Sequence, residues 1–187
     1  QKWAEDMQKS GMIVRYRKGR YQIRHPLIAA YLASLTFKDA DEFDRDEALL
    51  EKAFEPAWQD ALAFAAAHTP IDAVVQARMD AKNDVLQNTL LDTTRWLAHA
   101  PNANWRKPLF QALGKLLIAP NQYLSTRERI AAALIGTRDR NVMVIFKRAL
   151  NNRNPDVRRL ACLAAGALEA EKVLPELTEL LIDDNEN

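Results

Sequence analysis

The sequence has little of what marks a secreted, membrane-bound or disulfide-stabilised protein. It contains one cysteine, Cys162, which rules out an internal disulfide and is compatible with a reducing compartment. No stretch approaches the ~18 apolar residues that a membrane-spanning helix requires, and the first residues lack the pattern of a signal peptide. The formal net charge of +1 gives no overall attraction to nucleic acid or acidic lipid. We therefore expect a cytoplasmic protein without a membrane partner.

Sequence motifs for phosphate binding and catalysis are also missing. The chain has neither a Gly-x-x-x-x-Gly-Lys-Ser/Thr loop nor a Gly-x-Gly-x-x-Gly segment. The three histidines, His25, His68 and His99, are far apart, and none has a partner at a spacing that suits a metal ion. The serines lie outside nucleophile-elbow sequences. We expect no catalytic residue, no metal and no cofactor in this chain, which would then not be an enzyme by itself.

Glycine and proline are scarce, at five and eight residues, whereas alanine and leucine are abundant. This composition favours helices joined by short connections. From residue 56 onward, apolar residues recur at helical spacing between breaks rich in proline and asparagine. The predicted helices cover residues 56–67, 70–80, 84–99, 105–118, 125–137, 139–151, 155–168 and 172–182. The predicted fold class is therefore mainly α.

The segment 151–168 is the most informative part of the chain. The turn Asn154-Pro155-Asp156 precedes a helix with an alanine-rich face, and Pro155 suits the first helical position. A shift of 31 residues aligns this unit with an earlier one. The aligned pairs are Asp156 with Ser125, Arg158 with Arg127, Leu163 with Ala132, Leu177 with Phe146, Leu180 with Ala149, and Leu181 with Leu150. A helix-pair unit at this period predicts an α-solenoid. The alternative is a chance echo within an ordinary helical bundle.

The sequence Asn154-Pro-Asp-Val-Arg-Arg-Leu-Ala161 resembles the start of the second helix of a HEAT repeat. The resemblance implies a HEAT-like α-α superhelix over residues 56–187, with an extended face for a protein partner. The residues expected in its shared core are Leu160, Leu163, Leu177 and Leu181. The chain stops where a further repeat helix ought to start. We therefore expect a truncated array, cut from a longer protein.

Residues 1–37 follow a different pattern. Two segments alternate apolar with basic residues around Lys18-Gly19, which predicts a β-hairpin. A helix beginning near Pro26 follows, and a helix, a two-stranded wing and a second helix are typical of the tail of a winged-helix module. Residues 38–55 are acidic and predict a solvated linker leading into a short helix. A calcium loop is the weaker interpretation, because the segment has no glycine at a sharp turn.

The predicted hairpin carries a dense local group of basic residues. It contains basic residues and no acidic ones, with Tyr16 and Tyr21 among them. The basic residues are Arg15, Arg17, Lys18, Arg20 and Arg24. Such a wing could contact a phosphate backbone, which makes nucleic acid a candidate partner. The alternative, which we favour, is a hairpin face that contacts a neighbouring protein domain.

The sequence Tyr21-Gln-Ile-Arg-His-Pro-Leu-Ile-Ala-Ala-Tyr-Leu-Ala33 resembles the end of the winged-helix subdomain in NACHT-type STAND NTPases, with departures at Ala30 and Ser34. A repeat sensor domain commonly follows there. The resemblance implies a non-catalytic C-terminal fragment of a signal-transducing NTPase, acting as a sensor or protein-interaction scaffold next to an upstream NTPase domain. It also implies that His25 faces a nucleotide, with ATP or ADP bound only in the parent protein.

Three interpretations remain open from the residues themselves. His25 could equally cap its own helix, since it precedes Pro26 at a helix start. The whole chain could instead be a free-standing HEAT-repeat adaptor. A winged-helix nucleic-acid binder that uses the basic hairpin is the third possibility.

Overall fold

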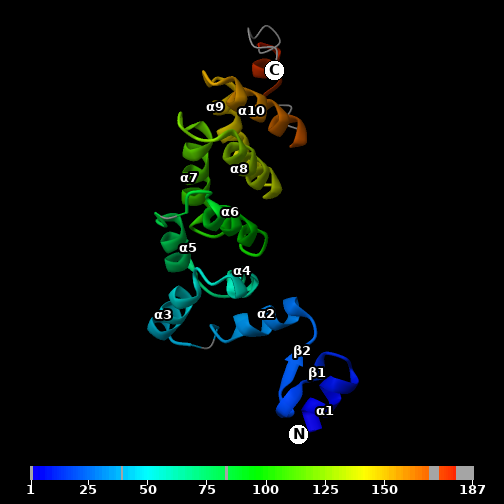
Figure 1. Ribbon diagram of the computed structural model, residues 1–187. Coiled ribbons are helices and arrows are strands. Elements are labelled where there is room, and N and C mark those ends of the chain that lie inside the picture. Colours follow the sequence, from blue (N-terminus) through cyan, green and yellow to red (C-terminus); the bar gives the residue numbers. More distant parts are fainter. Residues whose placement is uncertain (1, 39, 83, 169–172, 180–187) are drawn as a thin grey trace. The chain divides into compact units, whose positions relative to one another are not determined.

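The structure, a computed structural model, describes residues 2–38, 40–82, 84–168 and 173–179 (Figure 1). Most of these residues lie in helices, and the strands among them form a two-stranded antiparallel sheet. The prediction of a mainly α, HEAT-like fold with a β-hairpin near the N-terminus is therefore confirmed. The chain divides into two compact units, residues 1–77 and 78–187.

The first unit begins with a helix and the predicted hairpin. Helix α1 (Lys2–Lys9) contacts β1 (Ile13–Arg15), which pairs with β2 (Tyr21–Ile23). The chain reverses through the short 3₁₀ turn η1 (Arg17–Gly19), where Gly19 has φ +73°. A side chain with a Cβ is strained in that conformation, so the glycine is what permits the turn. Burial of Ala4 and Ile13 holds the helix against the sheet.

The remaining elements of the first unit are α2 (Pro26–Leu35), α3 (Glu42–Lys52), η2 (Pro56–Trp58) and α4 (Gln59–Ala65). Pro26 occupies the first turn of α2, as predicted. The Asp41 carboxylate accepts a hydrogen bond of 3.1 Å from the Asp44 amide and so caps α3. Helix α2 packs along α4, and the rings of Tyr31 and Phe64 meet edge to face with centroids 5.7 Å apart.

A histidine joins the end of α2 to the end of α4. The Ser34 hydroxyl donates to the Tyr31 carbonyl at 2.7 Å, so its lone pair can accept from His68 Nε2, which lies 3.1 Å away. The other ring nitrogen, Nδ1, lies 2.9 Å from the hydroxyl of Thr69 and can accept from it. Both contacts suit a neutral imidazole. Burial of the ring, with a smaller effect from the charge of Lys38, lowers the pKa of His68 below its ordinary value of 6.5.

The second unit is a stack of helices. Its elements are α6 (Asn88–Arg95), η3 (Trp96–Ala98), α7 (Arg106–Ile118), α8 (Leu124–Gly136), η4 (Arg140–Val142), α9 (Met143–Leu150), α10 (Pro155–Ala167) and α11 (Leu174–Glu179), while α5 (Asp72–Met79) runs across the boundary between the units. Helices α7 and α8 pack together, as do α9 and α10. Helix α8 contacts both α6 and α10, so these three form one layer, with α7 and α9 on its other side (Figure 1).

The 31-residue repeat is a property of the structure as well as of the sequence. Helices α8 and α10 both contain 13 residues, and α10 begins and ends 31 positions after α8. Helix α11 likewise begins 31 positions after α9. The period therefore covers a helix, the connection that follows it and the start of the next helix. This agreement confirms stacked helix pairs, because a chance echo would not preserve helix ends.

The prediction of the core residues of the second unit is only partly correct. Leu160 is buried as predicted, whereas Leu163 is 59% exposed, so its assignment to the core was wrong. The buried arc of α10 runs through Val157, Ala161 and Ala164, and Leu163 lies outside that arc on the helical wheel. Leu177 is half-buried, and Leu181 is outside the described residues.

Candidate functional site

The layer of α6, α8 and α10 carries a groove of about 340 Å³ between α6 and α8. Its lining consists of Leu91, Asp92, Thr94, Arg95, Ala98, Ala132, Ala133, Gly136 and Thr137. Four of these residues are alanine or glycine, so the hollow exists because side chains are short where the two helices approach one another. At Gly136 a Cβ would have no other atom within 4 Å, which shows that the space beside it is open. The groove can therefore accept a side chain from another molecule.

Charged and polar groups give the groove a polar edge. Asp92 and Arg95 project from α6, one turn apart, and Thr94 and Thr137 add hydroxyl groups. The hydroxyl of Thr94 donates to the Leu91 carbonyl at 2.6 Å. The groove thus combines a small apolar floor with an acidic and a basic group at its edge.

Two arginines cross from helix to helix within this layer. Arg129 of α8 donates to the Leu86 carbonyl at 2.9 Å and to the Asn88 side-chain oxygen at 2.5 Å, at the start of α6. Arg159 of α10 lies 3.2 Å from a carboxylate oxygen of Glu128 in α8. These bridges tie each helix of the layer to its neighbour, so they set the spacing of the surface that contains the groove.

A different pair of arginines closes the turns before α8 and α10. Arg127 donates to the Ala119 carbonyl at 2.5 Å, and Arg158, at the equivalent position, donates to the Asn152 carbonyl at 3.0 Å. Arg158 also donates to the carbonyl of Arg153 at 3.1 Å. Each guanidinium satisfies carbonyl groups that the preceding connection leaves without a helical partner. The arginine that the sequence repeat singles out is therefore a device that holds the turn.

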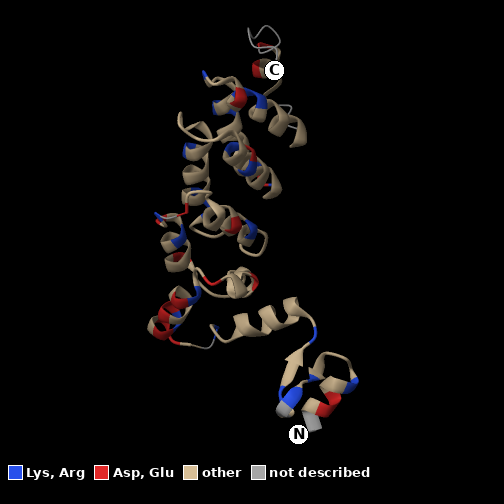
Figure 2. Cartoon of the chain, viewed as in Figure 1, with Lys and Arg blue, Asp and Glu red and all other residues tan. Residues whose placement is uncertain are grey.

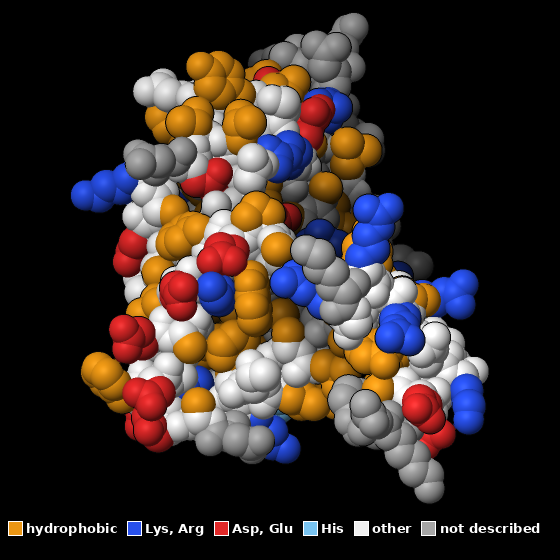
Figure 3. Space-filling view, turned by 60° about the horizontal axis from the view of Figure 1, so that its bottom comes forward, with side chains coloured by type: hydrophobic (Ala, Val, Ile, Leu, Met, Phe, Trp, Pro, Cys, Tyr) orange, Lys and Arg blue, Asp and Glu red, His pale blue; other side chains and the backbone are white. Residues whose placement is uncertain are grey.

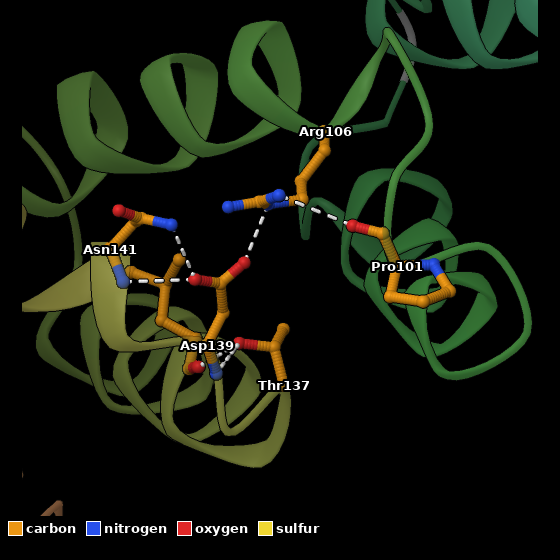
Figure 4. Close-up of polar contacts among 6 residues, drawn as sticks. Pro101, Arg106, Thr137, Asp139 and Asn141 are labelled. Carbon is orange, nitrogen blue, oxygen red and sulfur yellow. Dashed lines mark hydrogen bonds and ion pairs between the residues drawn. The ribbon is translucent and has the colours of Figure 1, made fainter.

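An ion pair connects successive helix pairs (Figure 4). Arg106, the first residue of α7, places Nε 2.5 Å from Oδ2 of Asp139, which begins the next pair. Asp139 also accepts from the Asn141 amide at 2.9 Å and so caps η4, while Arg106 donates to the Pro101 carbonyl at 3.2 Å. One carboxylate thus orders its own helix start and fixes the beginning of the preceding pair.

The structure reveals a buried arginine that sequence reasoning missed. Arg78 is 3% exposed, and its guanidinium carbon lies 4.6 Å from the ring centroid of Trp96. Nε donates to the Thr93 hydroxyl at 2.8 Å, and Nη2 donates to the Thr89 carbonyl at 2.9 Å. Burial lowers the pKa of Arg78 to about 10, although the negative charges of Asp92 and Asp84 act to raise it. At pH 7 the group is still charged, so it acts as a cationic clamp between α5 and α6.

The predicted basic residues are present on the hairpin, but they do not share one face. In the antiparallel pairing, Arg15 lies opposite Tyr21 on the face that also carries Ile13 and Ile23. Arg20 and Arg24 lie on the other face, because Tyr16 and Met12 are their backbone hydrogen-bond partners. Arg17 is exposed in the turn, and the side chain of Lys18 is outside what the structure describes.

His25 is the N-cap residue of α2, and its side chain makes no capping hydrogen bond. The alternative of a capping imidazole is therefore wrong. The His25 side chain is exposed at the start of α2.

The acidic segment 38–55 contains helix α3, Glu42–Lys52, and acidic residues occur along this helix (Figure 2). In the described part of the chain, no three histidine, cysteine, aspartate or glutamate side chains are placed to hold a metal ion. Among the described helices, none combines the length and the apolar character needed to cross a membrane.

Comparison with known proteins supports one of the two resemblances. Residues 107–187 match the family model of HEAT repeats, which supports a HEAT-repeat region in this part of the chain. No curated protein and no solved structure matched the chain. The match begins within α7 and includes α8 to α11, which are the helices that carry the 31-residue period.

Proposed function

We propose that this chain is a protein-interaction scaffold that binds a polypeptide partner on the layer of α6, α8 and α10. The observation that carries the proposal is the groove of about 340 Å³ between α6 and α8. The match to HEAT repeats supports it, because repeats of this architecture offer extended surfaces on which partners bind. The inter-helix bridges from Arg129 and Arg159 support it as well, since they hold the surface in one arrangement before binding.

The lining of the groove indicates the chemistry of the partner. Ala132, Ala133 and Gly136 leave room for an apolar side chain, and Asp92 and Arg95 can pair with charges beside it. A short amphipathic helix presents such a combination, with apolar anchors three or four residues apart and charges on the flanks. We therefore propose an amphipathic helix as the bound element.

A selection from displayed amphipathic helical peptides tests the proposal. The chain should enrich a related set of binders, and Gly136→Trp should abolish their binding, since an indole at this position, where an added Cβ meets no neighbour, would occupy the groove. Gln111→Trp is the matched control, because Gln111 is exposed on α7, in the other layer. Binders that bind wild type and Gly136→Trp equally would place the interaction elsewhere and reject the groove.

A second proposal concerns the N-terminal region. We propose that residues 1–37 are the end of a winged-helix subdomain in a NACHT-type NTPase, with His25 directed toward its nucleotide. The motif at residues 21–33 supports this, and so does the order of hairpin, α2 and repeat helices along the chain. The parent open reading frame decides it. A phosphate-loop sequence a few hundred residues upstream supports the proposal, and its absence favours a free-standing adaptor.

We also propose that the chain itself has no catalytic activity. Purified protein should not hydrolyse ATP or GTP above a blank. Activity that persists through repurification and disappears with a point mutation in this chain would overturn this proposal.

A further inference from the structure

Helix α3 exposes an apolar stripe bordered by acidic groups. Phe43 and Leu50 of α3, and Phe54 in the turn that follows the helix, are exposed by 78%, 42% and 54%. Phe43 and Leu50 are seven residues apart, which is two helical turns, so they lie on one face of α3. Glu47 and Glu51 border the stripe on one side and Asp46 on the other. Leu49 of α3 and Ala53, which caps its C-terminal end, are buried, so the helix packs on the core of the first unit through a different side. Two exposed phenylalanines on and just after one helix are unusual for a surface that meets only water.

The hairpin of the same chain presents the complementary surface. On its free face, Met12, Val14 and Tyr16 form an apolar column along β1, with Arg24, Gln22 and Arg20 opposite them along β2. Tyr16 is 63% exposed, while Ile13 on the other face is buried. The hairpin therefore has an apolar column beside a basic one, and α3 has an apolar stripe beside carboxylates.

The charges of these two surfaces are complementary. Residues 41–51 contain six carboxylates and one arginine, and residues 12–24 contain five basic residues and no acidic one. Figure 2 shows the acidic residues gathered on α3, and Figure 3 shows hydrophobic side chains next to acidic ones on the molecular surface. The apolar column of the hairpin extends roughly 13 Å at about 3.3 Å per residue. Phe43 and Leu50 lie roughly 10 Å apart along α3 at about 1.5 Å per residue.

We infer that the chain self-associates, with the hairpin face of one copy docked on the α3 face of another. Within one copy the two faces are exposed, so neither covers the other. The contact joins different surfaces, and two copies can make it reciprocally to close a dimer. One contact is small beside the roughly 1,200–2,000 Å² of a stable interface, so a reciprocal pair is the stronger arrangement. This inference uses the first unit and does not depend on the groove in the second.

Sedimentation velocity on the complete chain tests the inference. Wild type should associate as concentration rises at low ionic strength and should dissociate at high ionic strength, because the charges that join the copies are solvent-exposed. Arg20→Glu with Arg24→Glu should give monomers, and so should Glu47→Arg with Glu51→Arg. Mixing these two double variants should restore association, since each reversed surface then meets an oppositely charged one. Lys107→Glu with Lys115→Glu is the matched control, at exposed positions on α7, and should associate like wild type.

Two results would reject the inference. Wild type that remains monomeric at the highest concentration and lowest salt contradicts it, and so does failure of the mixed variants to associate when circular dichroism shows both to be folded. Addition of duplex DNA identifies the competing occupant. Salt-sensitive DNA binding by a monomeric wild type, lost in the Arg20 and Arg24 variant, would assign the hairpin to nucleic acid and overturn self-association.

Discussion

Arg127 and Arg158, 31 residues apart, donate to the backbone carbonyls of the turn that precedes their own helix. Their surroundings differ, because Arg127 is 2% exposed and Arg158 is half-buried. Loss of a buried charged donor leaves its acceptor without water as a substitute, whereas a half-buried acceptor can be hydrated. The arginine at this repeat position should therefore contribute more to stability as Arg127 in α8 than as Arg158 in α10.

We expect Arg127→Met to lower the free energy of unfolding by about 1–3 kcal/mol, and Arg158→Met to lower it by less. Methionine keeps the unbranched stem and removes the donors. Urea denaturation measures both values, with Lys115→Met on the exposed surface of α7 as the control. Equal effects of the two arginine substitutions would contradict the role assigned to burial.

The ion pair between Arg106 and Asp139 should show measurable coupling. A double-mutant cycle of Arg106→Met and Asp139→Asn should give about 1 kcal/mol, at the upper end of the range for exposed pairs, because both side chains are partly buried. Asparagine keeps an oxygen that can accept from the Asn141 amide, so the cycle separates the charge from the cap. Additive effects of the two substitutions would show that the pair contributes nothing.

Stability should depend on pH through His68. Because burial lowers its pKa in the folded state, the unfolded state binds more protons in the interval between the lowered value and 6.5. The free energy of unfolding should therefore be highest above pH 6.5 and should fall as the pH drops through that interval. Thermal unfolding of wild type and His68→Gln checks this, with His99→Gln as the control. A His68→Gln variant with the wild-type pH profile between pH 5 and 7 would contradict the prediction.

Replacement of glycine by alanine should have opposite effects on the stability of the protein at two positions. Gly166 lies inside α10 with open space where a Cβ would be, so Gly166→Ala should stabilise the protein by roughly 0.5–1 kcal/mol. Gly19→Ala should destabilise it by roughly 1 kcal/mol, because the positive φ of +73° strains a residue with a Cβ. Melting temperatures report both changes. At Gly114 a Cβ would lie 3.3 Å from Ile145, so the helical gain of alanine should be offset there.

Substitution of two leucines, one in the core of the repeats and one on their surface, should have very different effects on stability. Leu134 is fully buried, and Leu134→Ala should cost about 2–5 kcal/mol. Leu163→Ala should change the free energy of unfolding by less than about 0.5 kcal/mol, because that side chain is largely exposed. Chemical denaturation of the two variants side by side measures the contrast.

The sequence predicted local features well. Helix positions after residue 56, the hairpin turn at Gly19 and the helix start at Pro155 depend on spacing, φ preference and the missing proline amide, which are properties of a few neighbouring residues. The predicted period of 31 residues is confirmed for the same reason, because the breaks that end the helices lie at equivalent positions in both repeats.

Features that depend on contacts between helices could not be predicted in the same way. Leu163 has the hydrophobicity of a core residue, but its exposure follows from where α8 and α9 meet α10. Arg78 belongs to no recognisable sequence motif. Its partners Thr93 and Trp96 come after the connection between α5 and α6, and the sequence does not predict where that connection places them. The groove results from short side chains on two helices that become neighbours only after folding. The alanines of α8 were the one indication of a groove in the sequence, but alanines at these positions are equally typical of closely packed helices.

The ion pair between Glu128 and Arg159 joins equivalent positions of two successive repeats. Identical copies could not form it, because the same residue in both would place like charges side by side. Arrays of similar units risk pairing with the wrong neighbour while they fold, and misassembly is a characteristic failure of repeat proteins. Divergence at this position therefore gives the contact between α8 and α10 a pair of opposite charges, which a contact between identical repeats would lack. The sequence difference between the repeats thus favours this pairing of helices over a pairing of like copies.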